Sequence, residues 1–350
     1  MILSAEHSFS TDWDSIADVI ARGKRFLLTT HVNADPDALG SELALAEALR
    51  LLHKKPLILN PTASSSNHAF LDPNHEIQVY THPADFEGES LDAVFILDIS
   101  RWERLGALAE IIRDFSKPKI CIDHHPYTGG FADYHLVNTK ACASAEIVYD
   151  LIYYLGIPLN KKIAECIYAS VLSDTGSFTF SNTNARSHKI AADLMQQHIN
   201  TREIFEGLYQ NHTPERLRFM GKVIANLQFD CESKLAWSAV SRQMLDEHGL
   251  CPEDVEGFVD LPRNCGAVVL SILFLETAPE DIKISLRAKG NFNANKLAGI
   301  FGGGGHNHAS GIRMFGPLET VKQTILEEAR RAMKAYLEED LTAKTRLTPH

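Results

Sequence analysis

Short apolar segments alternate with helix-like segments over the first half of this chain, and this alternation restricts the fold more than any other feature. The apolar segments are RFLLTTHV at 25–32, KPLILN at 55–60, AVFILDIS at 93–100 and PKICIDHH at 118–125. Helical spacing of apolar residues predicts helices at 38–54, from Trp102 to about Phe115, near 144–155 and near 161–172. Because strands separated by helices are typical of parallel sheets, we predict an α/β domain with a doubly wound, mainly parallel sheet.

The second half of the chain has a different pattern. Only helices with charged faces are predicted directly after the first domain. The strand candidates KLAWSAVS, GAVVLSILFLET and DIKISLRAK follow, and a helix over roughly 318–337 comes last. A chain of 350 residues is long for a single hydrophobic core. We therefore predict a first domain over 1–184, a helical linker over 185–228 and a smaller α/β domain over 229–342.

Cysteine usage and the lack of long apolar runs bear on the compartment. The six cysteines are scattered and form no CxxC pair, which argues against a zinc–thiolate site or a disulfide framework. No apolar run approaches the ~20 residues that span a bilayer, and the first residues do not resemble a secretory signal. We therefore expect a cytoplasmic protein that does not associate with a membrane.

The net charge of −11 limits the nucleic acids that the protein can hold. Proteins that bind long nucleic acid usually neutralise many phosphates with a basic stripe, and no such stripe is visible in the sequence. We expect no binding to long duplexes. A nucleotide substrate should be short, or held locally by a few residues and metal ions.

Asp and His residues follow several of the predicted strands. His31, Asp35 and Asp37 follow the first strand, Asp98 ends the strand AVFILD, Asp123, His124 and His125 end the strand PKICI, and Asp174 follows a helix. In an open parallel sheet, ligands bind in the crevice beyond the carboxyl ends of the strands. We therefore expect these side chains to converge there.

A single Asp after a strand is more often a helix cap than a catalyst. Asp37 or Asp174 taken alone fits that alternative, because each adjoins a predicted helix boundary. Five carboxylates in one crevice would nevertheless repel one another strongly without cations. Mixed imidazole and carboxylate ligands suit Mn, Fe or Zn, and a pair of such ions can activate water and clamp a phosphoryl group. The pattern predicts two divalent metal ions, with manganese as the first choice and zinc or iron as alternatives.

The segments HVNADPDALGS, FILD, IDHHP and SDTGSF resemble the four ordered motifs of the DHH phosphoesterase family. ISLRAKG and FGGGGHNHASG resemble the DHH-associated carboxy-terminal domain. The resemblance covers about residues 15–335 and is strongest to the nanoRNase type, which also removes a phosphate from 3′-phosphoadenosine 5′-phosphate (pAp). Ala34 and Pro36 replace the Pro and Gly of the family's usual Pro-Asp-Gly-Asp sequence, while both carboxylates keep their spacing.

The resemblance implies a role for each residue of the first domain. His31 and Asp35 would hold one ion, Asp37, His124 and Asp174 would hold the other, and Asp98 would bridge both. Asp123 would orient the imidazoles. His125 would be the catalytic histidine, which stabilises phosphoryl oxygens or protonates the leaving group. No side chain need form a covalent intermediate.

In the second domain, the glycine run supplies backbone N–H groups that can approach a phosphate closely. The residues predicted to bind substrate are Arg287, Gly303, Gly304, His306 and Ser310. By resemblance, Arg287 and His306 bind a terminal phosphate or the nucleotide across an interdomain cleft. Such a cleft would favour very short oligonucleotides.

These observations predict a hydrolase that releases 5′-mononucleotides from short oligoribonucleotides and AMP from pAp. The nearest alternative is hydrolysis of linear or cyclic dinucleotides; an inorganic pyrophosphatase and a RecJ-like exonuclease are more distant ones. An alternative of another class is a non-catalytic nucleotide-binding regulatory module, although every expected ligand residue is retained. A homodimer is a further expectation, because homo-oligomers are common among soluble enzymes.

Overall fold

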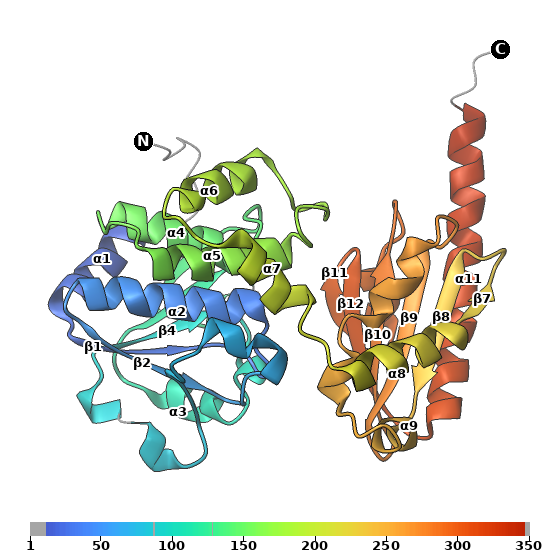
Figure 1. Ribbon diagram of the computed structural model, residues 1–350, viewed down its shortest axis with the longest axis horizontal. Helices are drawn as coiled ribbons and strands as arrows, with labels where there is room; N and C mark the ends of the chain where they lie inside the picture. Colours follow the sequence, from blue (N-terminus) through green and yellow to red (C-terminus); the bar gives the residue numbers. More distant parts are fainter. Residues whose placement is uncertain (1–11, 87, 128, 347–350) are drawn as a thin grey trace. The chain divides into compact units, whose positions relative to one another are not determined.

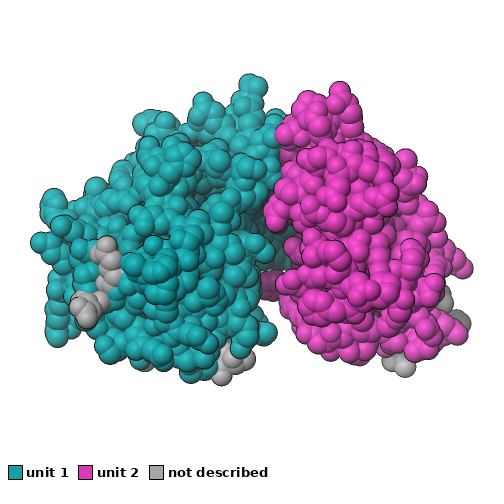
Figure 2. Space-filling model, turned by 90° about the horizontal axis from the view of Figure 1, so that it is seen from below, with its two compact units in different colours: residues 1–211 teal, residues 212–350 magenta. Residues whose placement is uncertain are grey.

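The chain forms two compact units, each with its own sheet and hydrophobic core. The computed structural model describes residues 12–86, 88–127 and 129–346. The units comprise Met1–Asn211 and His212–His350, which Figure 2 shows in different colours. In the described part of the chain, no helix combines the length and the apolar character needed to cross a membrane.

The first unit contains a six-stranded sheet in which every neighbouring pair of strands is parallel. Its strands are β1 (Arg25–Thr29), β2 (Lys55–Asn60), β3 (Ile77–Val79), β4 (Ala93–Leu97), β5 (Lys119–Asp123) and β6 (Tyr134–Val137). Their order across the sheet is β3-β2-β1-β4-β5-β6. The order reverses between β1 and β4, so the predicted doubly wound α/β fold is confirmed. The sequence did not predict the short strands β3 and β6.

Helices cover both faces of this sheet (Figure 1). They are α1 (Trp13–Arg22), α2 (Pro36–Leu51), α3 (Leu108–Asp114), α4 (Ser144–Tyr154), α5 (Lys161–Asp174), α6 (Ala185–Met195) and α7 (Thr201–Tyr209), with short 3-10 helices η1 (Ser66–Leu71), η2 (Pro83–Asp85), η3 (Gly88–Ser90) and η4 (Trp102–Leu105). Helices α2, α4 and α5 pack on one face and α3 on the other. Because α2 contacts α4, α5 and β2, it is buried on most sides and not on one amphipathic face alone.

The single helix predicted from Trp102 to about Phe115 is wrong, because η4 and α3 are separate. Gly106 lies between them with φ 54° and ψ −130°, a conformation outside the helical region. A Cβ at Gly106 would lie 2.8 Å from Cγ1 of Val32, so the break also allows close packing against the loop after β1. The N–H of Val32 donates to the carbonyl oxygen of Arg104 (2.8 Å), which ties η4 to the same loop.

The second unit contains a six-stranded mixed sheet covered on both faces. Its strands are β7 (Gln228–Asp230), β8 (Leu235–Val240), β9 (Leu270–Ala278), β10 (Asp281–Ala288), β11 (Gly304–His306) and β12 (Ala309–Phe315), in the order β11-β12-β10-β9-β8-β7. Its helices are α8 (Pro214–Ala225), α9 (Arg242–Asp246), η5 (Pro252–Val255), η6 (Phe258–Asn264), α10 (Ala294–Ile300) and α11 (Leu318–Arg346). Among the described residues of this unit, β8 and β9 pair in parallel and the other neighbouring strands are antiparallel. One core lies between the sheet and α10 and α11, and the other lies under α8, η5 and η6.

The helices of the 185–228 stretch belong to both units. Helices α6 and α7 contact α5 in the first unit, whereas α8 contacts β8, η5 and η6 in the second. The last helix extends beyond the predicted 318–337 to Arg346.

Candidate metal centre

The carboxyl ends of β1, β4 and β5 bring the predicted site residues of the first unit together. His31 lies two residues after β1, Asp98 directly follows β4, and Asp123 is the last residue of β5. Strands β1 and β4 are the neighbours between which the strand order reverses, and β5 is next to β4. In sheets of this topology, ligands bind beyond the carboxyl ends of the strands at the point where the order reverses.

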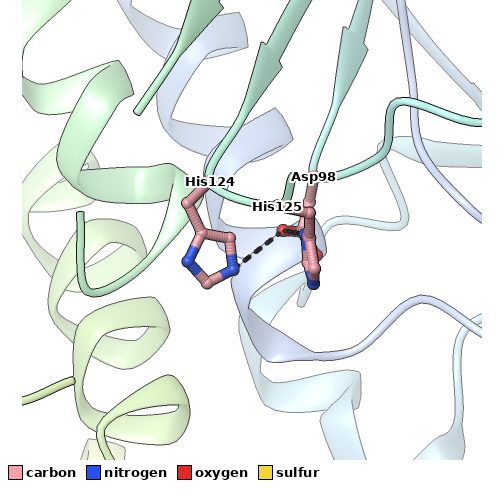
Figure 3. Close-up of side chains that lie close together, drawn as sticks. All are labelled: Asp98, His124 and His125. Carbon is pink, nitrogen blue, oxygen red and sulfur yellow. Dashed lines mark ion pairs between the residues drawn. The ribbon is translucent and has the colours of Figure 1, made fainter. Parts of the chain in front are cut away.

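Asp98 lies at the middle of the site and is almost completely buried. Its carboxylate oxygens lie 3.4 Å from Nε2 of His31, 3.6 Å from Nε2 of His124 and 3.7 Å from Nδ1 of His125. The hydroxyl group of Ser144 donates to Asp98 Oδ1 (2.8 Å). Figure 3 shows the ring of His124 directed at this carboxylate, which His125 overlaps in this view.

The backbone conformation of Asp98 is uncommon for a residue other than glycine. Its φ is 58°, and Asn33 in the loop after β1 has φ 56°. Asp and Asn tolerate this left-handed region better than most residues, and such positions are frequent at functional sites. The turn at Asp98 ends β4 and directs the carboxylate toward the histidines.

The two most buried histidines direct the same ring nitrogen at the carboxylates. Nδ1 of His31 donates to the carbonyl oxygen of Val32 (2.9 Å), and Nδ1 of His124 donates to that of Ala141 (3.3 Å). A carbonyl oxygen only accepts, so these contacts place a proton on Nδ1, and in the neutral ring Nε2 then carries the lone pair. Nε2 of His31 is buried and makes no hydrogen bond within the described residues. This is the arrangement of histidines that bind metals.

The side chains of Asp and His residues form three overlapping groups, each of which could hold a cation. Within the described residues, the groups are His31, Asp35 and Asp98; Asp37, His124 and Asp174; and Asp98, His124 and His125. The ligand atoms of each group lie within 4.8 Å of one another. The structure therefore brings together all of the metal ligands that the sequence predicted.

Asp35 and Asp37 have different local roles at the start of α2. Asp35 is the N-cap, and its Oδ1 accepts the N–H of Ala38 (3.1 Å). The buried carboxylate of Asp37 accepts the N–H groups of Ser144 (2.7 Å) and Ala145 (3.1 Å) at the start of α4. The sequence allowed Asp37 as the N-cap of this helix, but the N-cap is Asp35. Ser144 was not predicted as a site residue, although the helix that it begins was.

Asp123 orients His125 through two hydrogen bonds. Its Oδ1 accepts from Nδ1 of His125 (2.8 Å) and from the backbone N–H of His125 (3.1 Å). Asp123 is fully buried, whereas the side chain of His125 is 30% exposed. Asp123 was predicted to orient the imidazoles, and the structure shows its direct contact with His125. The ring of His124 is held by the carbonyl oxygen of Ala141 instead.

Asp174 ends α5 and is tied to the loop that follows it. Nδ2 of Asn182 donates to the carbonyl oxygens of Asp174 (3.0 Å) and Cys142 (2.9 Å) and lies 3.4 Å from Oδ2 of Asp174. Asn182 was missed by the sequence analysis, because a single Asn eight residues after Asp174 carries no pattern of its own. Its position is visible only once the loop is folded.

Opposite charges at the centre shift the pKa values of His124 and Asp98 in opposite directions. Burial lowers the pKa of His124, but the carboxylates of Asp174, Asp98 and Asp37 outweigh it and raise the pKa to about 9. Burial favours the protonated form of Asp98, yet the adjacent imidazole of His31 and the charges of His124 and His125 hold its pKa well below the usual range. Without cations, a protonated His124 therefore compensates the charged Asp98 at neutral pH.

The charge of His124 compensates the outer carboxylates, Asp37 and Asp174, only in part. Burial, followed by the charges of Asp98 and Asp174, raises the pKa of Asp37 well above its ordinary value. Burial raises the pKa of Asp174 to about 7. Protons thus occupy positions where two divalent cations would supply the missing positive charge. The donor set and the open Nε2 of His31 fit cations of the Mn, Fe or Zn type.

Glu42 on α2 is a fully buried carboxyl group outside the three metal groups. Its Oε2 accepts from Nδ2 of Asn60 (3.0 Å), and its Oε1 makes no hydrogen bond within the described residues. Burial raises its pKa to about 8 against the opposing hydrogen bond from Asn60. A carboxyl group that binds its proton more tightly in the folded state destabilises the fold as the pH rises from about 4.5 to about 8.

Glu42→Gln is therefore expected to flatten the pH dependence of stability. The amide keeps the shape and the hydrogen bond from Asn60 but never ionises, so the stability that the variant gains relative to wild type should be about 4 kcal/mol larger at pH 9 than at pH 5. Urea unfolding of both proteins in EDTA at the two pH values measures the difference. If the substitution changed the free energy of unfolding equally at pH 5 and pH 9, the raised pKa of Glu42 would be contradicted.

In the second unit, Arg287 and His306 lie in one row across the sheet. Arg287 on β10 is opposite Ala309 on β12, and Ala309 is opposite His306 on β11. Residues directly opposite each other in antiparallel strands share a face of the sheet. The structure therefore places these two predicted residues on the same face, with the small side chain of Ala309 between them.

The other predicted residues of this unit have structural contacts. The hydroxyl group of Ser310 donates to the carbonyl oxygen of His306 (2.8 Å), and Ser310, adjacent to Ala309 in the strand, points to the opposite face. A Cβ at Gly303 would lie 2.3 Å from the carbonyl oxygen of Gly311, so strand packing requires glycine there. At Gly304 a Cβ would approach only Asn295, at 3.8 Å.

Comparison with known proteins shows similarity in both units. Residues 25–171 match the model of the DHH family, N-terminal domain, and residues 233–338 match that of the DHHA1 domain. The chain is 31% identical to the bifunctional oligoribonuclease and PAP phosphatase NrnA of Thermus thermophilus, over 87% of this chain and 89% of that protein. The identity to the NrnA of Bacillus subtilis is 30%, over 83% of this chain and 89% of that protein. A solved structure of an exopolyphosphatase-related protein from Bacteroides fragilis has a TM-score of 0.85 at 28% identity and covers 93% of this chain and 96% of its own.

Proposed function

The chain belongs to the DHH family of phosphoesterases, with a DHHA1 domain after the DHH domain, and from this membership we propose that it hydrolyses very short oligoribonucleotides to 5′-mononucleotides and pAp to AMP. The observation that supports the proposal most is the set of interlocking Asp and His groups around Asp98. The relatives in Thermus thermophilus and Bacillus subtilis, which carry both activities in their names, support the choice of substrate.

We propose that the site holds two cations, with manganese first and zinc or iron as alternatives. His31, Asp35 and Asp98 would hold one, and Asp37, His124 and Asp174 the other, with Asp98 shared. When bound, such cations lower the pKa of water and neutralise phosphoryl oxygens. The Nδ1 hydrogen bonds of His31 and His124 fix each ring with Nε2 toward the carboxylates.

His125 is the side chain that we assign to proton transfer. Asp123 holds its Nδ1 proton, which fixes the ring and makes Nε2 the nitrogen that exchanges a proton with substrate. When the ring is protonated, it can donate its Nε2 proton to the leaving oxygen. The partial exposure of His125 keeps it within reach of a substrate.

The substrate preference is consistent with the charge of the protein. A net charge of −11 disfavours long phosphate backbones, whereas a substrate with one or two phosphates needs only local positive charge.

The six cysteines are free, which supports our expectation of a reducing, cytoplasmic compartment.

A substrate panel tests the proposal. Protein stripped with EDTA should be inactive, and Mn²⁺ should restore rapid release of 5′-mononucleotides from an RNA of a few nucleotides and of AMP from pAp. A much longer RNA, pyrophosphate and a cyclic dinucleotide should be poor substrates. Chromatographic separation of the products measures each rate with Mn²⁺, Zn²⁺, Fe²⁺ and no metal.

The outcomes separate the alternatives. If only the cyclic dinucleotide or only pyrophosphate were cleaved, the assignment as a phosphoesterase would stand, but the proposed substrate class would be wrong. A panel with no turnover under any metal would favour the non-catalytic nucleotide-binding module.

A further inference from the structure

Two arginines follow Asp98 in the segment after β4. Arg101 is the N-cap of η4, is exposed, and makes no capping hydrogen bond with its side chain. Arg104 lies inside η4 and is half-buried. Because this segment starts at the carboxylate in the middle of the site, both arginines leave the sheet at the edge where the candidate metal centre lies.

These two arginines differ from most others in the chain by having no partner. Most arginines whose side chains the structure describes contact a carboxylate, a carbonyl oxygen or an aromatic ring; examples are Arg186, Arg216 and Arg113, respectively. Within the described residues, the side chains of Arg101 and Arg104 make no hydrogen bond and no ion pair. An exposed arginine can remain in water at little cost, which accounts for Arg101. The half-buried Arg104, in a chain with 45 acidic residues, requires another explanation.

The backbone of Arg104 is fixed against the loop after β1. Its carbonyl oxygen accepts the N–H of Val32 (2.8 Å), the residue after His31. Gly106 approaches the same loop so closely that a Cβ would lie 2.8 Å from Cγ1 of Val32. Leu105, between Arg104 and Gly106, is fully buried. These contacts hold η4 beside the loop that carries His31, and none of them uses the side chain of Arg104.

The charge of Arg104 acts on the candidate metal centre. Burial and the charge of Arg104 both lower the pKa of His31, and the neighbouring carboxylates outweigh them and raise it. The guanidinium group is thus close to an acidic site and is bonded to none of its carboxylates. Its planar fork of N–H donors remains available for an anion that enters the site. A phosphoryl group matches this fork, because two of its oxygens can accept two N–H groups side by side.

We propose that Arg104 contacts the phosphoryl group that is hydrolysed and stabilises the negative charge on its oxygens as the transition state forms. This inference rests on the proposed function and adds a catalytic residue to it. A guanidinium group keeps its positive charge at every working pH, so this contribution does not depend on protonation.

Removing the side chain of Arg104 should slow hydrolysis without loss of the cations. Arg104→Ala should lower kcat/KM for pAp about a hundredfold. Its affinity for Mn²⁺ in a calorimetric titration should stay within about threefold of the wild-type value, short of the tenfold to hundredfold loss expected for a residue that supports a metal ligand. Arg104→Lys should fall between, because lysine keeps the charge but loses the fork. The backbone contact with Val32 remains in both variants, and circular dichroism verifies that they fold.

The matched control is Arg202→Ala. Arg202 lies on α7 of the same unit, is exposed, and pairs with Glu206 one helical turn away (2.7 Å). The substitution removes the same charge from the protein, so kcat/KM and the affinity for Mn²⁺ should stay at their wild-type values. An equal loss of kcat/KM in Arg202→Ala and Arg104→Ala would show a general effect of net charge and would overturn the contact.

Binding of inorganic phosphate separates a substrate contact from a structural role. Full-length protein with Mn²⁺ bound is titrated calorimetrically with phosphate, which is the group that hydrolysis of pAp releases. Arg104→Ala should weaken this affinity about tenfold, whereas Arg202→Ala should leave it unchanged.

Each further outcome of these measurements decides on Arg104. Unchanged phosphate affinity or unchanged kcat/KM in Arg104→Ala would overturn the assignment, and so would a loss of Mn²⁺ binding large enough to explain the loss of activity. If the wild type cleaves neither pAp nor short RNA, the proposed function fails, and the phosphate titration alone decides on Arg104.

Discussion

Asp98→Ala is expected to lower kcat by at least about a thousandfold and to weaken metal binding at both cation positions. Asp98 is the carboxylate that contacts His31, His124 and His125 together, and it belongs to two of the three groups that could hold a cation. Because its pKa lies well below the usual range, it is charged at every working pH. Steady-state rates with pAp and calorimetric titration with Mn²⁺ measure the two effects.

Asp92 provides a matched control at the other end of the same strand. It precedes β4 and accepts the backbone N–H groups of Lys24 (2.7 Å) and Arg25 (2.9 Å). The Asp92→Asn variant should keep kcat within about twofold of the wild-type value, although it loses one negative charge, as Asp98→Ala does. Circular dichroism of both variants in EDTA verifies that they fold. An Asp98→Ala protein that folds and retains a tenth of the wild-type kcat would contradict the central position of Asp98.

The sequence predicted the first unit well because its fold follows from local patterns. Buried parallel strands are continuous apolar runs, and the Asp and His residues that end them stand out against those runs. The rule that strand ends meet at the switch point then placed His31, Asp98 and Asp123 together before any contact was known. That convergence is a property of the topology, so it needed no knowledge of side-chain positions.

The parts that escaped prediction depend on contacts distant in the sequence. The start of α4 donates to Asp37 across more than a hundred residues, and Asn182 reaches Asp174 from an irregular loop. The break at Gly106 follows from its close approach to Val32, which no helical periodicity reveals. In the second unit, the pairing of Arg263 with Asp260 occurs in a 3-10 helix, for which apolar spacing gives little signal.

Two residues of the glycine-rich segment that the sequence predicted as substrate-binding have structural explanations. The segment's resemblance to a phosphate-binding loop drew attention to Gly303 and Ser310, yet strand packing and the hydrogen bond to His306 explain both residues structurally. Arg287 and His306 differ, because they occupy one row on the same face of the sheet. The register of the strands, which the sequence does not specify, separates the two groups.

Removing metal is expected to lower the thermal stability of the first unit by about 10 °C. Even one such cation, present at about a thousandfold above its dissociation constant, would stabilise the fold by roughly 4 kcal/mol, and a unit of this size shifts by ~2–4 °C per kcal/mol. The stabilisation should be smaller at pH 6 than at pH 8. At the lower pH, protons on His124, whose pKa is about 9, and on Asp174, whose pKa is about 7, compete more strongly with the cations.

Differential scanning calorimetry with EDTA and with Mn²⁺ at both pH values measures this shift. Because the predicted ligands all lie in the first unit, a transition of the second unit should stay where it is when metal is removed. Asp98→Ala should lose most of the shift, whereas Asp92→Asn should keep it. A melting temperature that is identical with and without metal at pH 8 would mean that the buried carboxylates are compensated by protons alone, and the two-cation assignment would then fail.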